Sequence, residues 1–276
     1  LDMDLYLRIA PELYLKRLLV GGLERVYEIN RNFRNEGIDT RHNPEFTMLE
    51  FYQAYADYHD LMTLTEELLP HLCRVLLGGE ELTYQGVRVN LSPPWPRLTV
   101  VEALRKVGGI PEGLEGVERL RAVAAHRGVP VQAGWGWGKC VDALMAHLVE
   151  PHLVQPTFLL DFPLELSPLA RSRPDDPRLA QRFELFVAGL ELANAYTELT
   201  DPQEQRQRLE DQLRAREGGD EEAHRMDEDF VRALEYGMPP AAGEGIGIDR
   251  LVMLFTDSPS IRDVILFPQL RPKEQG

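Results

Sequence analysis

Two stretches near the start of the chain alternate apolar and polar side chains with a period of two, one within residues 24–34 and one within 46–55. This period predicts two strands of an antiparallel sheet. The segment between them contains the turn formers Gly37 and Asn43-Pro44, so the two strands are expected to form a long hairpin. The side chains predicted to share a face are Tyr27, Ile29, Arg31 and Phe33 in the first strand, and Phe46, Met48, Glu50 and Tyr52 in the second.

Most of the remaining chain repeats its apolar residues with helical spacing. The helix predicted from Pro11 to Gly21 would bury a stripe formed by Leu13, Leu15, Leu18 and Leu19. Further helices are predicted at 58–77, 98–107, 115–127, 138–149, 202–216, 228–236 and 249–255, and further strands at 5–9, 157–161 and within 182–199. The run Gly134–Gly138 is interpreted as a packed turn between helices, because glycine marks turns far more often than it builds sites.

The order of these segments indicates an α+β fold. Strands and helices do not alternate as β-α-β units, which favours an antiparallel β-sheet flanked by helices. The three helices between residues 98 and 150 follow a proline-rich break at 93–96 and are interpreted as a helical insertion between sheet strands.

Composition narrows the class of protein. The chain has 276 residues, 43% of them hydrophobic, and no apolar run near the roughly 18 residues of a membrane-spanning helix. Its first residues lack the basic start and apolar core of a signal peptide, and its two cysteines lack metal-ligand spacing, which fits a reduced cytoplasmic location. The net charge of −15 argues against a nonspecific nucleic-acid binder, while Arg31, Arg34 and Arg41 leave room for a local basic contact with one RNA.

The predicted hairpin carries candidate chemistry. Arg34 ends its first strand, and Glu50 and Tyr52 project from its second. A guanidinium binds a phosphate or carboxylate through two parallel hydrogen bonds and, when placed in advance, stabilises charge that grows on a phosphate during reaction. The alternative is that Arg34 is a surface cation paired with Glu36.

The segment 245–250, Gly-Ile-Gly-Ile-Asp-Arg, is a second candidate. Its glycines allow close approach of the backbone, and Arg250 is able to lie flat on an adenine ring with Phe46 on the opposite side. The alternative is a packed β-bulge at Gly245 and Gly247, since a glycine-rich segment alone is a weak indication.

A third group is acidic and lies within 182–199. Alternation puts Asn194, Tyr196 and Glu198 on one face of a strand. Carboxylates at such a site bind Mg2+ on a nucleotide or pair with a cationic substrate. A rim of solvated acids is the alternative, and it is disfavoured because Glu184 and Glu191 sit among apolar neighbours. The histidines lack ligand spacing for a metal, and His42 alone falls inside the candidate nucleotide loop.

The segments FRNE and RHNPEFT at 33–47, together with GIGIDR at 245–250, resemble motifs 2 and 3 of the class II aminoacyl-tRNA synthetases. The likeness runs from Asp2 to Pro272, is closest in kind to the catalytic domain of subclass IIb lysyl-tRNA synthetases, and includes DLYLRIAPELYLKRL, LVQPTFLLDFP, ELANAYTEL and LEYGMPP. It implies that residues 1–276 form a class II catalytic domain. It also implies activation of L-lysine by Mg·ATP to lysyl-adenylate and pyrophosphate, followed by transfer to the 3′ end of tRNA(Lys).

The resemblance implies roles for individual residues. Those implied for ATP are Arg34 at the α-phosphate, Glu36 at the adenine amino group, His42 and Asn43 near the phosphates, Phe46 and Arg250 around adenine, and Glu184 and Glu191 on Mg2+. Those implied for lysine are Glu12 at its α-ammonium, Tyr52 and Glu198 at its ε-ammonium, Asn194 at its carboxylate, and Glu50, Tyr196 and Gly245 around it. Arg34 and Arg250 would be the catalytic residues, through positioning and charge stabilisation rather than as a general base.

The sign of this pocket fits a cationic substrate. Glu12, Glu50 and Glu198 would repel an aspartate side chain and attract a cation, and buried polar groups penalise ligands that leave them unpaired. Lysine is the natural fit, and charge alone leaves arginine open. The resemblance further implies a cytoplasmic homodimer without membrane attachment.

The chain also departs from the resembled family. Motif 1, a dimer-interface helix and strand, and the OB-fold that reads the anticodon would lie upstream of Leu1, so dimerisation and tRNA selection are in doubt for this chain. Tyr196 stands where many bacterial members have phenylalanine, and Leu190 where some have a cation. One alternative is a ligase that attaches lysine or β-lysine to elongation factor P, although that group carries alanine at the position of Gly245. Another is a non-catalytic binding module, which predicts loss of arginines that are present here.

Overall fold

The computed structural model describes residues 2–35, 37–110, 116–217 and 226–270. Its α-helices are α1 (Glu12–Val20), α2 (Tyr58–Leu77), α3 (Val100–Lys106), α4 (Val117–Arg127), α5 (Trp137–Leu148), α6 (Pro202–Glu217), α7 (Glu228–Glu235) and α8 (Ile248–Thr256). Its strands are β1 (Arg25–Phe33), β2 (Glu45–Ala54), β3 (Glu81–Tyr84), β4 (Val87–Asn90), β5 (Arg97–Thr99), β6 (Thr157–Leu160), β7 (Arg182–Val187), β8 (Leu190–Thr197) and β9 (Ala241–Gly247).

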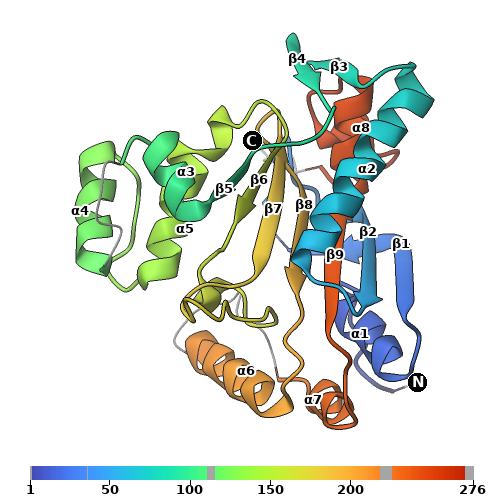
Figure 1. Cartoon of the computed structure of the whole chain (residues 1–276), viewed down its shortest axis with the longest axis vertical. Helices are drawn as coiled ribbons and strands as arrows, with labels where there is room; N and C mark the ends of the chain where they lie inside the picture. The colour runs from blue at the N-terminus through green and yellow to red at the C-terminus, as the bar shows by residue number, and fades with distance from the viewer. Residues whose placement is uncertain (1, 36, 111–115, 218–225, 271–276) are drawn as a thin grey trace.

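One seven-stranded sheet organises the molecule, in the order β1-β2-β9-β8-β7-β6-β5 (Figure 1). The predicted hairpin is confirmed as β1 and β2, and every neighbouring pair in the sheet is antiparallel except β5 with β6. The fold class is therefore α+β as predicted, with helices flanking a sheet that is antiparallel except for this one pair at its edge. β5 is a three-residue strand that joins the sheet in parallel at its edge, just before the chain enters the insertion.

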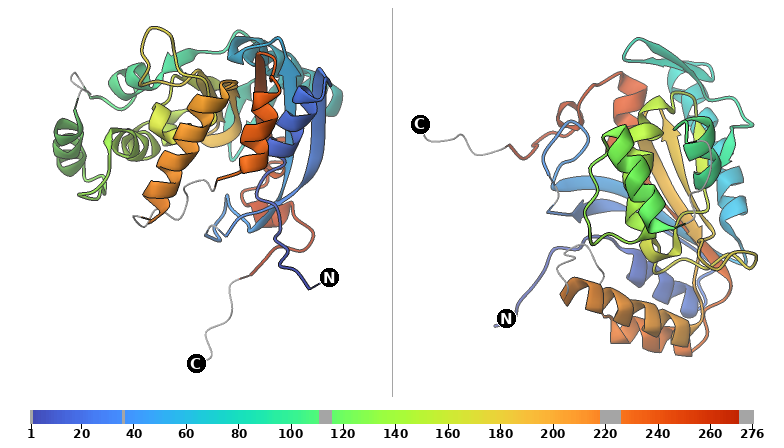
Figure 2. Two further views of the ribbon diagram at one scale, coloured as in Figure 1. Left: turned by 90° about the horizontal axis from the view of Figure 1, so that it is seen from below. Right: turned by 90° about the vertical axis from the view of Figure 1, so that its left-hand side faces the viewer.

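The predicted helical insertion is present as α3, α4 and α5. These helices stand together beyond the β5 edge of the sheet (Figures 1 and 2), and they share a buried apolar cluster with Leu159 of β6 and Phe186 of β7. The run Gly134–Gly138 lies where α5 begins, and the side chains of Trp135 and Trp137 pack against that cluster, as expected of a packed turn. The insertion thus packs onto the edge of the sheet without interrupting the central strands.

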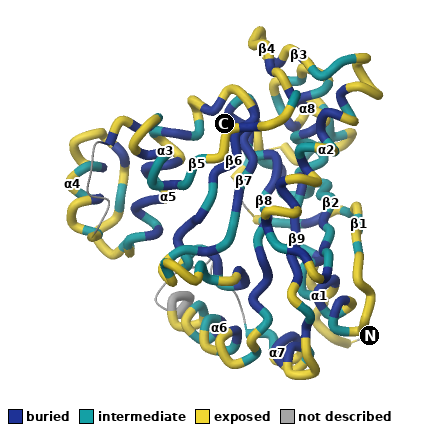
Figure 3. The backbone as a smooth tube through the Cα atoms, viewed as in Figure 1, coloured by how far each residue is buried: buried dark blue, intermediate teal, exposed yellow. Residues whose placement is uncertain are grey.

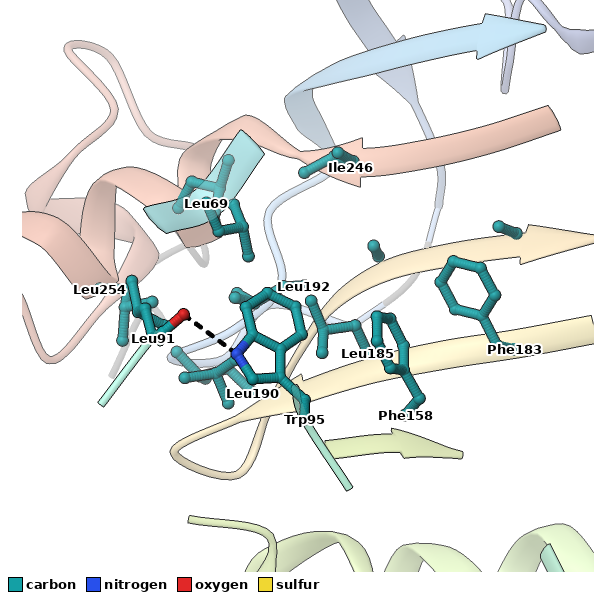
Figure 4. Packing of buried hydrophobic residues seen from close by; sticks show 14 of the residues in the cluster. Leu69, Leu91, Trp95, Phe158, Phe183, Leu185, Leu190, Leu192, Ile246 and Leu254 are labelled. Atoms are coloured by element: carbon teal, nitrogen blue, oxygen red, sulfur yellow. Dashed lines mark hydrogen bonds between the residues drawn. The ribbon is translucent and has the colours of Figure 1, made fainter. Parts of the chain in front are cut away.

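The two faces of the sheet are covered by different helices. α2 covers one face, over a core in which Phe158 packs edge-on against Phe183 and Trp95 donates a 3.1 Å hydrogen bond to the carbonyl of Leu91 (Figure 4). α1 and α7 cover one end of the opposite face, through a smaller cluster that includes Tyr52. The remainder of that second face is therefore available for polar side chains.

Three local predictions are corrected. Residues 5–9 form no strand, because their backbone makes a single ladder-like bond, from Phe33 N–H to the carbonyl of Arg8. Helix α1 buries only part of the predicted leucine stripe: Leu15 and Leu19 are buried as predicted, together with Lys16, while Leu18 is 42% exposed. The two-stranded sheet of β3 and β4 was not predicted.

Among the described helices, none is both long and apolar enough to cross a membrane.

Strand β1 alternates as predicted, but some of its apolar side chains face solvent and some of its polar ones face inward. Tyr27 and Ile29 are exposed at 73% and 58%, while Glu28 and Asn32 point inward. Figure 3 shows this exposed edge of the sheet along β1. An apolar outer face on an edge strand marks a surface suited to a protein partner.

Candidate active site

Polar side chains from four strands, with a glycine of β9 between them, form a row across the sheet face that α1 and α7 leave partly open. The register pairs Glu28 with Glu50, Glu50 with Gly245, Gly245 with Asn194, and Asn194 with Glu184. Residues paired directly in an antiparallel ladder point to the same face. The adjacent row consists of Val26, Tyr52, Gly243, Tyr196 and Arg182. Segments far apart in sequence are therefore brought together as the sequence predicted.

Glycines in β9 make room at the centre of these rows. A Cβ added at Gly243 would lie 2.7 Å from Glu198 Oε1, and closer still to the ring of Tyr52. A Cβ at Gly245 would lie 2.9 Å from the Cε of Met48. The ring of Tyr52 leaves no room for a side chain at Gly243, whereas at Gly245 only the flexible end of Met48 would have to move. At these two positions the central strand contributes a floor without side chains.

Helix α1 supplies the acidic wall at one end of the pocket. Glu12 and Lys16 are one turn apart on α1 and therefore share a face. The ammonium of Lys16 lies 2.5 Å from Glu12 Oε1 and 2.6 Å from Glu198 Oε2, although the side chain is only 1% exposed. Tyr196 donates a hydrogen bond to Glu12, and Lys16 Nζ lies 5.2 Å from the centre of the Tyr196 ring. Five of the predicted lysine-binding residues thus come together in a cage that also contains a cation of the chain itself: Glu12, Glu50, Tyr52, Tyr196 and Glu198. The other two, Asn194 and Gly245, lie in the neighbouring row.

Burial dominates the electrostatics of this cage. It raises the pKa of Glu198 to about 8, a rise that the ammonium of Lys16 opposes. It raises the pKa of Glu50 to about 7, helped by the charge of Glu12 and opposed by the hydrogen bond that Tyr52 donates at 2.5 Å. For Lys16, burial lowers the pKa, but the two adjacent carboxylates outweigh it and raise the pKa overall, so the ammonium is charged. A charged ammonium at 2.6 Å favours the ionised form of Glu198.

The candidate nucleotide end of the site is assembled from the hairpin loop and α8. The guanidinium of Arg34 lies 5.2 Å from the centre of the Phe46 ring, and its Nε donates to the carbonyl of Ile9. Arg250 donates to Nε2 of His42 at 3.2 Å, which leaves Nδ1 of that ring as the protonated nitrogen facing Asp39. Of the two predicted catalytic arginines, Arg34 therefore lies against Phe46, and Arg250 is hydrogen-bonded to the loop that contains His42.

Other predicted nucleotide residues have different surroundings. Arg250 also donates to the carbonyl of Glu191 at 2.7 Å and to its carboxylate at 3.2 Å, which links α8 to β8. The side chain of Asn43 is buried and bonded to the carbonyl of Glu45 and the amide of Gln269, so it holds the loop in place. Glu36 lies outside the described residues.

The two predicted metal ligands differ in exposure. Glu184 has a side chain 13% exposed, paired with Arg182 at 2.5 Å, whereas the side chain of Glu191 is 40% exposed. Burial raises the pKa of Glu184 to about 8, and the charges of Glu191 and Glu150 add to that rise. Burial and the charges of Asp142 and Glu191 raise the pKa of Glu150 to about 7.

The negative charges of Glu184, Glu191 and Glu150 thus add to the effect of burial, as is expected where carboxylates gather around a cation. Oxygen donors of this kind suit Mg2+. In the described part of the chain, no group of three or more histidine, cysteine, aspartate or glutamate residues is arranged to hold a metal alone. Mg2+ binding by Glu184 and Glu191 therefore stays a prediction.

Three residues at the site were not found from the sequence. Lys16 lies within the predicted leucine stripe, where a lysine is expected to face solvent. Its spacing of four from Glu12 was the one sequence feature that could have indicated an ion pair. Gly243 lies two residues before the candidate segment 245–250. Only the ladder register, which pairs it with Tyr52 and Tyr196, shows that it lies in the pocket. Arg182 donates to Asn194 Oδ1 at 3.0 Å and to Glu184, and its place two residues before Glu184 could have indicated this.

Comparison with known proteins identifies relatives of this arrangement. Residues 1–271 match a family model described as tRNA synthetases class II (D, K and N). The lysine–tRNA ligase of Carboxydothermus hydrogenoformans is 60% identical over 275 residues, covering 99% of this chain and 56% of that protein. The lysine–tRNA ligases of Moorella thermoacetica and Chloroflexus aurantiacus are 60% and 54% identical, covering 100% and 99% of this chain and 56% of each relative. The chain thus spans about half the length of the curated relatives it matches.

Proposed function

This chain belongs to the tRNA synthetases class II (D, K and N), and we propose that it is a catalytic domain that activates L-lysine with ATP and transfers the lysyl group to the 3′ end of tRNA(Lys) in the cytoplasm. The observation that carries the choice of lysine is the buried cage of Glu12, Glu50 and Glu198. Glu198 Oε1 is buried and has no hydrogen-bond partner among the described residues, so it is an acceptor aimed at a ligand. The names of the relatives agree with this choice.

The lysine substrate would lie along the glycine floor. Its ε-ammonium meets Glu198 Oε1 and the hydroxyl of Tyr52, its α-ammonium meets Glu12, and its carboxylate lies toward Asn194. An aspartate side chain in the same place would bring a fourth carboxylate into a buried acidic site, which is strongly unfavourable. Selectivity against acidic substrates therefore follows from charge.

Activation is attack of the substrate carboxylate on the α-phosphate of ATP, with pyrophosphate as the leaving group. Arg34 stabilises the charge that grows on the phosphate oxygens, and its guanidinium is placed before the reaction, so little reorganisation is needed. Phe46 and Arg250 hold the adenine ring between them, while His42 steadies Arg250. When bound by Glu184 and Glu191, Mg2+ would neutralise phosphate charge and orient the leaving group.

The deciding assay is amino-acid-dependent ATP–pyrophosphate exchange with L-lysine, L-arginine, L-aspartate and L-asparagine. We expect exchange with lysine and none with aspartate or asparagine. Tyr52→Phe, which removes one hydroxyl and keeps the ring, should raise the KM for lysine and leave that for ATP unchanged. Exchange driven by aspartate or asparagine, or by no amino acid, would refute the proposed substrate. Charging of purified tRNA(Lys), compared with modification of elongation factor P, then identifies the acceptor.

We also propose that the chain pairs with a second copy through β1 and the segment that precedes α1. The support is an apolar surface at the sheet edge: Tyr6 is 80% exposed, Leu7 70%, Tyr27 73% and Ile29 58%. Sedimentation velocity should report a dimer for the wild type. The variant Ile29→Asp should shift the equilibrium to monomer, whereas Val75→Asp, a matched change at a residue 67% exposed on α2, should not. A monomeric wild type would reject this pairing.

A further inference from the structure

Lys16 is a buried cation that the proposed chemistry does not use. Its ammonium contacts one oxygen of Glu12 and one oxygen of Glu198, at 2.5 and 2.6 Å. Three aromatic rings surround it: the centres of Tyr52, Tyr196 and Phe230 lie 5.8, 5.2 and 5.9 Å from Nζ. A charged side chain buried to this extent is costly unless it is paired, and here the pairing is complete.

The two oxygens of Glu198 are used differently. Both oxygens are buried and neither makes a hydrogen bond of good geometry within the described residues, but Oε2 lies 2.6 Å from the ammonium of Lys16 in an ion pair, which leaves Oε1 as the oxygen open to a ligand. Ammonium and guanidinium groups place different demands on such a carboxylate. An ammonium is a compact charge whose three donors turn freely, so it needs only one oxygen from any single carboxylate, whereas a guanidinium pairs best through two parallel hydrogen bonds to both oxygens.

We propose that Lys16 is a specificity-determining residue that favours lysine over arginine, because it occupies one oxygen of Glu198 and leaves a single acceptor for the side-chain cation of the substrate. The inference rests on the proposed function and adds to it the discrimination that pocket charge alone does not provide. Lys16 acts through Glu198 and Glu12, so it is a positioning residue rather than a catalytic one.

The same geometry sets the charge of the pocket. The titratable and charged groups that face Glu198 are Glu12 and Lys16 from α1, Glu50 and Tyr52 from β2, and Tyr196 from β8. Without Lys16, three carboxylates would share one buried space with no internal cation. Both oxygens of Glu198 would then be open to a guanidinium. The added negative charge would attract the ammonium of lysine and the guanidinium of arginine alike, so the preference for lysine would weaken.

The test is the ratio of kcat/KM for lysine to that for arginine in ATP–pyrophosphate exchange, measured for the wild type and for Lys16→Met, which removes the charge and keeps a similar volume. We expect the ratio to fall by about tenfold or more, since an unpaired polar group is the main source of discrimination between ligands. The KM for ATP should not change. The matched control is Lys106→Met, which removes an exposed lysine that pairs with Glu102 at 3.0 Å and the same spacing of four.

Each outcome separates the possibilities. A wild type without lysine-dependent exchange would refute the proposed function rather than the role of Lys16. If Lys16→Met has an unchanged ratio and lower activity on both amino acids, Lys16 has only a structural role. If Lys16→Met has a lower KM for lysine, Lys16 competes with the substrate for the cage. Either result would overturn the inference. If Lys16→Met does not fold, Lys16→Gln is measured in the same way, and failure of both variants to fold would place Lys16 in folding alone and overturn it as well.

Discussion

Replacing Glu244 by glutamine should stabilise the protein, and by an amount that depends on pH. Glu244 lies on β9, on the face covered by α2, and is 1% exposed. Its carboxyl oxygens accept hydrogen bonds from Thr65 at 2.8 and 2.9 Å. No cation pairs with it among the described residues, and burial raises its pKa to about 8. Glutamine retains the shape and an oxygen acceptor for Thr65 while removing the titration.

The magnitude follows from linkage between proton binding and folding. The folded state keeps a proton on Glu244 up to about pH 8, whereas the unfolded chain releases it near an ordinary value of about 4.5. The contribution of this group to stability is therefore full below the lower value and is lost as pH rises through the upper one. Between these values the loss is about 1.4 kcal/mol per pH unit, which amounts to about 3 kcal/mol at pH 7 and about 1 kcal/mol at pH 5.

Urea denaturation of the wild type and Glu244→Gln at pH 5, 6, 7 and 8 measures this effect. The free energy of unfolding of the variant should exceed that of the wild type by a margin that grows with pH. Glu50, Glu150, Glu184 and Glu198 also have raised pKa values, but they contribute to both proteins and cancel in the difference. Glu235→Gln, at an exposed position on α7, is the control and should show no margin. A margin that is the same at pH 5 and pH 8 would refute the reasoning.

Three further outcomes are expected at the site. Gly243→Ala should raise the KM for lysine more than about tenfold without changing that for ATP, because the added methyl group collides with Tyr52. The control is Gly79→Ala, where nothing lies within 4 Å of the added atom, and equal kinetics of the two variants would contradict a role for Gly243 in the pocket. Arg250→Lys should raise the KM for ATP while thermal stability falls little, because a lysine cannot keep the planar contacts of a guanidinium; an unchanged KM would remove Arg250 from the nucleotide site. Chelation of divalent ions should abolish exchange, and Glu184→Gln should increase the Mg2+ concentration needed to restore it, as a Mg2+ titration would record; an unchanged requirement would argue against Glu184 as a ligand.

The sequence predicted the elements whose residues repeat strongly. The alternation in β1 and β2, and the apolar spacing in α2, were long enough to fix both type and bounds, and α2 has the predicted bounds of 58–77. The three-residue strand β5 and the four-residue strands β3 and β4 carry too few residues for any period to show. Segment 5–9 has apolar composition typical of a strand, but a strand also needs a neighbouring ladder, which the local sequence does not encode.

Site residues divide in the same way. Glu50, Asn194 and Glu198 were predicted from types and spacing, and the structure places them on one face. Lys16 could not be assigned to the interior from sequence, because a lysine in an amphipathic helix normally faces solvent. Its burial depends on two carboxylates, one of them directly after β8 and 182 residues away, and such pairing appears only when the chain is folded.

The glycine floor of β9 also bears on how such a pocket diverges. Because β9 offers backbone and no side chains at Gly243 and Gly245, the side chains proposed to distinguish one amino acid from another stand on α1 and β2 and on β8 or directly after it. These elements are separated widely in the sequence, so a duplicated gene could acquire a new substrate preference by point changes in the flanking elements while the central strand stays as it is. An experimenter who wishes to redirect the pocket should randomise those flanking positions and leave the glycines alone.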